Sequence, residues 1–142
     1  SIEEVYNKET LGAINGMRAL RIDRIYFDGS VPRKPSNAGP YPLEPYTLTE
    51  TGREVSTDEL FQLRSLLLDP GSYIGSQWAC GFDAEYAFAG PGPQPLFIMA
   101  GTKCHLVSIA GPDFRSGGNL TREAAAILRS FCEGLLRLDT LE

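Results

Sequence analysis

One stretch decides the fold of this chain: WACGFDAEYAFAGPGPQPLFIMAGTKCHLVSIAG, which runs from Trp78 to Gly111. Its pattern predicts three successive strands. Near residues 84–89, aromatic and small apolar residues alternate, as in a strand with one buried face. The prolines after this strand interrupt the chain, and a continuous apolar run over residues 96–101 and a strand over residues 104–110 follow. The link between these two strands is short enough for a hairpin.

Further strands and helices are expected on either side of this stretch. Residues 18–28 and 46–55 have the alternating or β-prone patterns that are typical of strands. Ser56 and Glu59 have the spacing of a capping box, which predicts a helix over residues 57–68. Another helix is expected over residues 122–137, because apolar side chains recur on one face there.

This order of elements predicts one α+β domain over residues 1–142, with a mainly antiparallel sheet and two helices packed on one face. Arg24 falls among the apolar positions of the 18–28 strand, which places that strand at an edge of the sheet. Residues 1–16 are weakly patterned and predict one helical turn or a mobile terminus. Residues 112–119 contain two adjacent glycines and are expected to form a loop.

The segment VPRKPSNAGPYPLEP, residues 31–45, is rich in proline. Proline blocks a helix and removes a ladder donor, so we expect a loop within the domain. Loops of this length without regular structure are often functional. Two interpretations stay open: an arm that presents Tyr41 and Leu43 to a partner, or a surface connection that lies against the sheet.

Composition excludes some classes of function. The chain has 142 residues and a formal net charge of −5, and its Lys and Arg residues are scattered along the sequence. A nucleic-acid partner is therefore not expected. No apolar run approaches the ~20 residues of a membrane-spanning helix. The chain begins with Ser1, which is compatible with an exported, periplasmic protein or with a trimmed cytoplasmic one, and a lipid anchor upstream of Ser1 stays open.

The cysteines and the single histidine form the one conventional catalytic set in the sequence. A thiol nucleophile needs an imidazole within hydrogen-bonding reach. Cys104 and His105 are neighbours on an expected strand, and neighbours on a strand point to opposite faces, so we expect no activation of Cys104 by His105. Cys80 with His105 stays an alternative. No catalytic residue is assigned on this basis.

Metal binding is not expected either, because the cysteines show no CxxC pair, and no cofactor is expected. A disulfide between Cys80 and Cys104 is a candidate, with two separate reduced cysteines as the alternative. It would close a loop worth roughly 3 kcal/mol in the chain-entropy account and would need an oxidising compartment. Cys132 lies on the apolar face of the last expected helix, where it should be buried, unpaired and chemically quiet.

Two segments resemble a group of small uncharacterised bacterial proteins. CGFDAEYAF, from Cys80 to Phe88, is similar to the motif C-x-F-x-P-x-Y-A-x-x-F of that group, with Ala84 in place of its Pro. LRSLLLDPGSY, residues 63–73, is similar to the LxxxLLDPxSY segment that precedes the motif. An apolar strand and another Cys follow in the group, as they do here. The resemblance covers roughly residues 50–136.

The resemblance implies an exported or lipid-anchored bacterial protein, in a group that includes immunity or inhibitor proteins. It implies no activity and no functional residues. Gly101 stands where many members carry an additional Cys that forms CxxC with the one matching Cys104. Its loss weakens a metal or redox role for the cysteines.

Together these observations predict a non-enzymatic binding protein, an inhibitor or immunity-type protein of a bacterial effector or envelope enzyme. Its expected partner is a protein. The candidate binding residues are Tyr41, Leu43, Tyr73 and Trp78. Two alternatives stay open: a small thiol-dependent enzyme that uses Cys104 or Cys80 with His105, and an accessory domain of a cell-envelope assembly.

Overall fold

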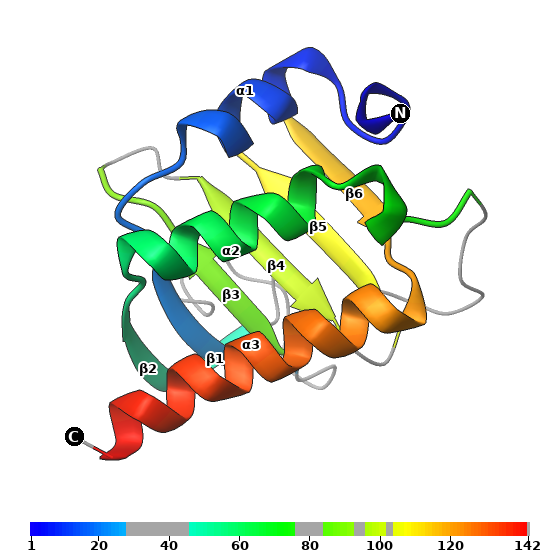
Figure 1. The fold of residues 1–142 in the computed structure, drawn as a ribbon. Coiled ribbons are helices and arrows are strands. Elements are labelled where there is room, and N and C mark those ends of the chain that lie inside the picture. Colours follow the sequence, from blue (N-terminus) through cyan, green and yellow to red (C-terminus); the bar gives the residue numbers. More distant parts are fainter. Residues whose placement is uncertain (28–45, 76–83, 93–95, 102–103, 142) are drawn as a thin grey trace.

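The computed structural model describes residues 1–27, 46–75, 84–92, 96–101 and 104–141. These residues form an α+β domain with a six-stranded antiparallel sheet, strand order β2-β1-β3-β4-β5-β6, and three α-helices (Figure 1). The strands are β1 (Arg21–Phe27), β2 (Tyr46–Glu54), β3 (Tyr86–Ala89), β4 (Phe97–Gly101), β5 (Leu106–Ala110) and β6 (Arg115–Asn119). The helices are α1 (Lys8–Gly16), α2 (Thr57–Leu68) and α3 (Arg122–Leu141), with short 3₁₀ turns at Ile2–Glu4 and Pro70–Ser72.

The predicted α+β class, the antiparallel sheet and the helices on one of its faces are confirmed. The β4–β5 hairpin is also confirmed, although β5 begins at Leu106. Two elements were not predicted: α1, in the weakly patterned N-terminal segment, and β6, in the glycine-containing segment expected to be a loop.

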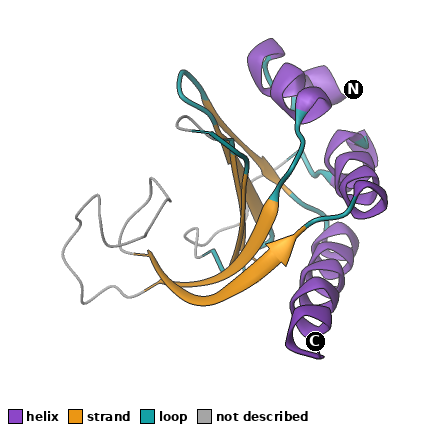
Figure 2. Cartoon of the chain, turned by 90° about the vertical axis from the view of Figure 1, so that its left-hand side faces the viewer, coloured by secondary structure: helices purple, strands orange, loops and turns teal. Residues whose placement is uncertain are grey.

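All three helices cover the same face of the sheet (Figure 2). That face holds the main hydrophobic core, to which alternate strand residues contribute large side chains such as Tyr86, Phe88 and Ile98. Each fully buried side chain of this size stabilises the fold by about 2 kcal/mol. A smaller cluster consists of Ile25, Ala84, Ala87, Phe97 and Met99. Successive side chains of a strand point to opposite faces of the sheet, so the strands contribute to two clusters of different size.

The prediction from Arg24 that the first strand lies at an edge of the sheet is wrong, because β1 lies between β2 and β3. The Arg24 guanidinium donates two hydrogen bonds to the Glu133 carboxylate of α3, at 2.8 and 3.0 Å, and Tyr86 donates another to Glu133. The bonds from Arg24 hold the Glu133 pKa at about 2, so the pair stays charged at neutral pH. A basic residue is tolerated on this interior strand because its charge is paired across the helix–sheet interface.

Side-chain caps position α1. Asn7 precedes the helix, and its side-chain oxygen accepts hydrogen bonds from the backbone N–H and the hydroxyl of Thr10. At the other end, Arg64 of α2 donates to the carbonyls of Ile14 and Met17, at 3.2 and 2.9 Å. Since terminal helix carbonyls lack intrahelical partners, these bonds fix α1 against α2.

Candidate functional site

The segment that follows α2 organises a cleft at the β6 edge. The Asp69 side chain accepts from the Gly71 N–H at 2.8 Å and fixes the turn that ends the helix. The Ser72 hydroxyl donates to the Leu66 carbonyl and the Tyr73 hydroxyl to the Leu67 carbonyl, both at 2.7 Å. These carbonyls lie in the last turn of α2, where backbone acceptors need partners from outside the helix. The DPGSY segment is therefore a C-terminal cap built from side chains.

Tyr73 continues from this cap into a pair with Tyr6. Their hydroxyls are 2.6 Å apart, and their rings lie edge to face with centroids 5.4 Å apart. A hydroxyl has one proton, and that of Tyr73 is donated to Leu67, so Tyr6 donates to Tyr73. Burial raises the pKa of both phenols above their ordinary value of 10. Both hydroxyls stay protonated at neutral pH and act as structural donors.

The tyrosine pair lies against β6. A Cβ atom at Gly118 would lie 2.6 Å from Cε1 of Tyr73 and 3.1 Å from the Tyr6 hydroxyl oxygen, closer than packed side chains allow. The next residue, Ile74, donates its N–H to the Asn119 carbonyl at 2.9 Å. The rings and this backbone bond hold the segment after α2 along the end of β6.

A cleft of about 420 Å³ lies between this segment, the N-terminal turn and β6. Its lining combines a carboxylate, three apolar side chains, one aromatic ring and several backbone positions without bulky side chains. The lining residues are Ser1, Glu4, Val5, Pro70, Tyr73, Ile74, Gly75, Gly117, Gly118 and Asn119.

The backbone of β6 alternates between β5 and the outer edge. Gly111 N–H donates to Phe114 C=O at 3.0 Å, and Leu120 N–H donates to His105 C=O at 2.7 Å, at the two ends of the β5–β6 ladder. The register between these bonds is continuous. In an antiparallel pair, hydrogen-bonded positions alternate with positions whose backbone groups point away. The backbone N–H and C=O groups of the even-numbered residues of β6 therefore point towards β5. Those of Arg115, Gly117 and Asn119 point away from β5, towards the outer edge of the sheet.

The bond from Ile74 agrees with this alternation, because it reaches the carbonyl of an outward residue, Asn119. Arg115 and Gly117 are exposed to solvent. Their outward N–H and C=O groups have no hydrogen-bond partner within the part of the chain that the structure describes. This edge is thus open beside the cleft.

Of the predicted binding residues, the structure places Tyr73 at this site. It is half-buried, and its hydroxyl is engaged in the cap, so it shapes the cleft wall. Tyr41, Leu43 and Trp78 lie outside the described residues, as does the Pro-rich segment 31–45. Glu4, Ile74 and Gly117 were not predicted as site residues. The turn-forming residues Asp69 to Ser72 are the feature of the sequence that could have indicated an ordered segment after α2.

The structure corrects the prediction that Cys104 and His105 are neighbours on a strand, because β5 begins at Leu106. Cys104 and His105 lie in the turn before β5, and His105 has a φ of +44°, so the opposite-face argument does not apply to them. Cys104 is 3% exposed, and neither residue lines the cleft at β6. Cys104 is disulfide-bonded, so it has no free thiol to act as a nucleophile. Cys80 lies outside the described residues, so its place as the bonding partner of Cys104 stays a prediction.

Cys132 is confirmed as a buried free cysteine, with no exposed surface. Burial raises the pKa of its thiol, which disfavours the reactive thiolate. Over the described ranges, no three His, Cys, Asp or Glu side chains are grouped to hold a metal ion. Nor does any helix described in the structure have the length and apolar composition to cross a membrane.

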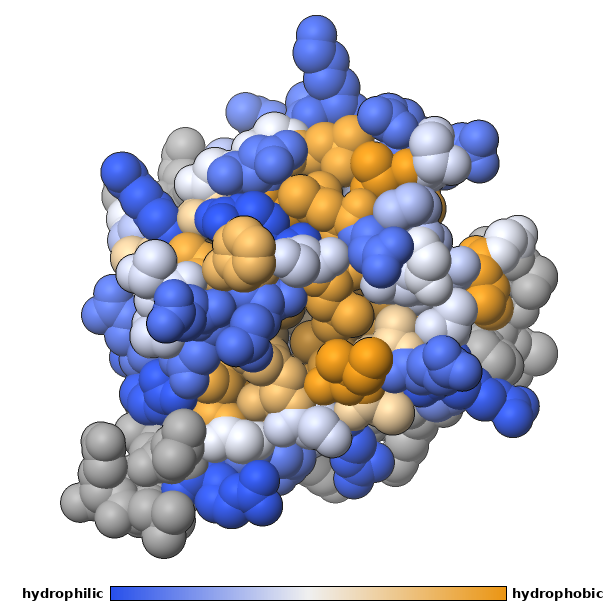
Figure 3. Space-filling model, in the orientation of Figure 1, coloured by the Kyte–Doolittle hydropathy of each residue, from blue (hydrophilic) through white to orange (hydrophobic). Residues whose placement is uncertain are grey.

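The helix-covered face has a second surface of interest. Phe61 of α2 is 65% exposed and Ile127 of α3 is 59% exposed. Apolar residues also reach the surface between the polar outer faces of the helices (Figure 3). Single exposed apolar residues are common on soluble domains, so this face is a weaker candidate than the cleft at β6.

Comparison with known proteins identifies no relative: no protein-family model, no curated protein and no solved structure matches the chain. The resemblance to the small bacterial group therefore stays a prediction. The residues of the cleft carry the functional argument by themselves.

Proposed function

We propose that this chain is a non-enzymatic protein-binding protein, an inhibitor or immunity-type protein that covers a bacterial effector or envelope enzyme. The cleft of about 420 Å³ beside the open edge of β6 carries the proposal. It provides a shaped surface with backbone donors and acceptors next to apolar side chains. Recognition sites of proteins combine these features, with a few groups contributing most of the affinity.

The chemistry of the lining also supports binding. Among the described residues that line the cleft, Glu4 is the single charged side chain, and there is no Cys or His. Tyr73 is held protonated and hydrogen-bonded to Leu67. A hydrolase would need a nucleophile, a base and a charge stabiliser around one point. The net charge of −5 suits a partner with a basic surface.

The proposal includes an exported, periplasmic location, with the cytoplasm as the alternative. An accessory role in a cell-envelope assembly is a second version of the same binding function, in which the partner is a structural protein. The identity of the captured protein distinguishes the two.

A cross-linking capture in a bacterium that encodes the protein tests the binding function. Ile74→Arg places a charged side chain in the cleft, and Gln62→Lys adds a charge on the exposed side of α2 as the matched control. We expect the partner captured by the wild-type chain to be lost with Ile74→Arg and kept with Gln62→Lys. Urea unfolding of both variants checks that they are folded.

The same experiment addresses the thiol-enzyme alternative. His105→Ala and Cys104→Ser are expected to keep the partner, whereas Tyr41→Ala is expected to weaken its capture if the Pro-rich segment contributes. If folded His105→Ala lost an enzymatic activity that the wild-type chain has, the binding proposal would be replaced by the thiol enzyme.

A further inference from the structure

The open edge of β6 has the geometry of a template for another strand. Arg115 and Gly117 both direct N–H and C=O outward, and both are exposed. Gly117 has no side chain to keep an approaching backbone away. The strand is in continuous register with β5, so the outward groups are regularly spaced.

We propose that the partner binds by strand addition: an extended segment of its chain pairs with Arg115 and Gly117 as a seventh strand beside β6. This inference rests on the proposed binding function and states its mode. Main-chain hydrogen bonds give affinity in such complexes, and alternate side chains of the added strand enter neighbouring pockets. The cleft lined by Tyr73, Ile74 and Gly117 is the pocket next to this edge.

The chain itself already uses part of this edge in the same way. Tyr73 and Leu120 form an isolated antiparallel bridge, and Ile74 N–H donates to Asn119 C=O. The backbone geometry at the end of β6 is therefore suitable for a ladder on its outer side. Because Asn119 C=O is occupied, the added strand pairs along Arg115 to Gly117 and extends away from Asn119.

A second copy of this chain is a less favourable occupant than a different protein. Antiparallel pairing of two β6 strands would place Arg115 of each opposite Gly117 of the other. The two Arg115 side chains would then be diagonal neighbours on one face, about 7–8 Å apart at their Cα atoms. Like charges at this distance oppose pairing, whereas a partner strand with an acidic or neutral residue there avoids the repulsion.

The test uses a displayed library of short random linear peptides, selected on the wild-type protein. Gly117→Pro removes one outward N–H, and the β5–β6 ladder loses no bond because Gly117 does not face β5. Gly117→Ala keeps the N–H and is the matched control. We expect selected peptides to bind Gly117→Pro at least about tenfold more weakly than Gly117→Ala, in line with one lost hydrogen bond.

Amide hydrogen exchange of the wild-type protein gives a readout that does not depend on how a variant folds. In the free protein, the Arg115 and Gly117 amides should exchange rapidly, and those of Ser116 and Gly118 slowly. Peptide binding should slow exchange at Arg115 and Gly117 by at least about tenfold, the change that one stable hydrogen bond gives. Methylation of every second backbone nitrogen of the peptide should weaken binding when the methylated nitrogens are those that face β6. Methylation of the intervening nitrogens should leave binding unchanged.

Three results would overturn the inference. Peptides that bind without protecting Arg115 and Gly117 would leave the binding function standing and exclude strand addition. A concentration-dependent dimer that Gly117→Pro abolishes would assign the edge to a second copy. Failure to select any peptide on the wild-type protein, while cross-linking still captures a partner, would exclude strand addition and leave the binding function standing.

Discussion

The two edges of the sheet are built differently. At one edge, β2 pairs with β1 through two register shifts, between Arg21 and Asp23 and between Arg24 and Ile25. At the other, β6 pairs with β5 without a shift. Bulges bend and twist a strand and hinder the addition of another, whereas a regular edge favours it. The bulged β2 edge is thus less suited to another strand than the regular β6 edge, as the proposed strand addition at β6 requires.

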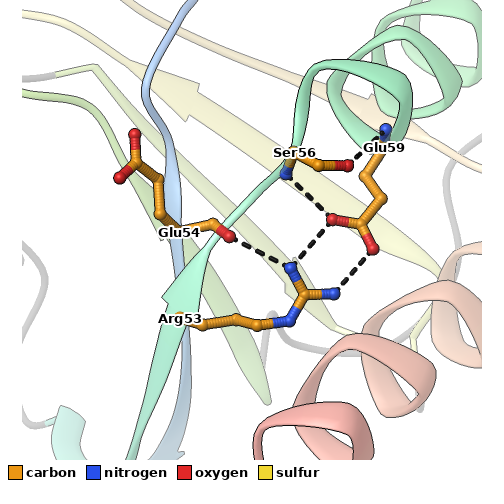
Figure 4. Close-up of polar contacts among 4 residues, drawn as sticks. All are labelled: Arg53, Glu54, Ser56 and Glu59. Carbon is orange, nitrogen blue, oxygen red and sulfur yellow. Dashed lines mark hydrogen bonds and ion pairs between the residues drawn. The ribbon is translucent and has the colours of Figure 1, made fainter.

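The β2 edge is also fixed by charge where it leads into α2. The Arg53 guanidinium donates to both carboxylate oxygens of Glu59, at 2.9 and 2.6 Å, and to the Glu54 carbonyl (Figure 4). Glu59 also accepts from the Ser56 N–H, and the Ser56 hydroxyl accepts from the Glu59 N–H, as the capping-box spacing predicted. One carboxylate thus joins the end of β2 to the first turn of α2.

Each edge depends on a glycine, for different physical reasons. A Cβ atom at Gly52 of β2 would lie 2.0 Å from the Ile22 carbonyl oxygen, so the bulge needs close approach of two backbones. The buried Asp23 carboxylate accepts from the Gly52 N–H at 3.0 Å and supports this bulge. At Gly118 of β6, the obstacle to a side chain is the Tyr73 ring.

Gly52→Ala is expected to have the largest effect, because backbone atoms cannot move aside as a side chain can. We expect a loss of about 3 kcal/mol in the free energy of unfolding, at the upper end for overpacking. Urea denaturation measures it. Gly12→Ala in α1 is the control, because no atom lies within 4 Å of its Cβ position, and it should stabilise the protein by about 0.5–1 kcal/mol. A loss of less than about 0.5 kcal/mol in the free energy of unfolding for Gly52→Ala would contradict the bulge geometry.

Gly118→Ala is expected to cost about 2 kcal/mol, since the Tyr73 ring must shift while its hydroxyl remains bonded to Leu67. Its neighbour Gly117 is the matched position, where the nearest atom to a Cβ is the Val107 carbonyl oxygen at 3.2 Å. The Val107 carbonyl needs to give way by only a few tenths of an ångström, so Gly117→Ala should cost about 1 kcal/mol less than Gly118→Ala. Equal losses at both positions would show that the ring contact does not decide the effect.

Some of these elements could be predicted from the sequence, and β6, which contains Gly117 and Gly118, could not. The strand β3 was predictable because its apolar residues alternate, and β4 because it is a continuous apolar run joined to β5 by a short link. The helix α2 was predictable because Ser56 and Glu59 have cap spacing. β6 was not, because RSGGN has a low intrinsic strand preference. Its strand conformation depends on pairing with β5 and on two tyrosines, Tyr6 and Tyr73, that are distant in sequence.

The same reasoning applies to α1 and to the site. Gly12 and Gly16 reduce the helix propensity of α1, which tertiary contacts from Arg64 and the buried Ile14 offset. Tyr73 was predicted as a candidate binding residue. Its hydroxyl bond to Leu67 could not be predicted, because it depends on where the turn at Asp69 directs the chain.

The tyrosine pair allows a finer test of the β6 edge. Tyr73→Phe removes the donor to Leu67 C=O and the acceptor for Tyr6, whereas Tyr6→Phe leaves the bond to Leu67 in place. We expect losses of about 1.5 kcal/mol for Tyr73→Phe and about 1 kcal/mol for Tyr6→Phe, from the usual net value of a hydrogen bond and the cost of an unpaired group. Urea unfolding ranks them, and the reverse order would contradict the direction of donation.

The smallest expected effect lies at the β2 edge and depends on pH. The hydrogen bonds from Arg53 lower the Glu59 pKa from its ordinary 4.5 to about 2. Above pH 4.5, the carboxylate is charged in both the folded and unfolded chain, and its contribution to stability is fully present. As pH falls from 4.5 towards 2, the unfolded chain binds the proton first, so this contribution is lost. Because Glu59 is 20% exposed, solvent screening reduces the contribution to about 1 kcal/mol.

Glu59→Gln separates this charge from the cap, since Gln at this position still completes a capping box. The variant should be about 1 kcal/mol less stable than the wild-type chain at pH 7, and the difference should vanish near pH 2. Asp58→Asn removes an exposed carboxylate from the same helical turn and is the matched control for the loss of one negative charge. Urea unfolding at a series of pH values measures both. A difference that persists at pH 2 would mean that Glu59 stabilises the β2–α2 junction through packing and not through its charge.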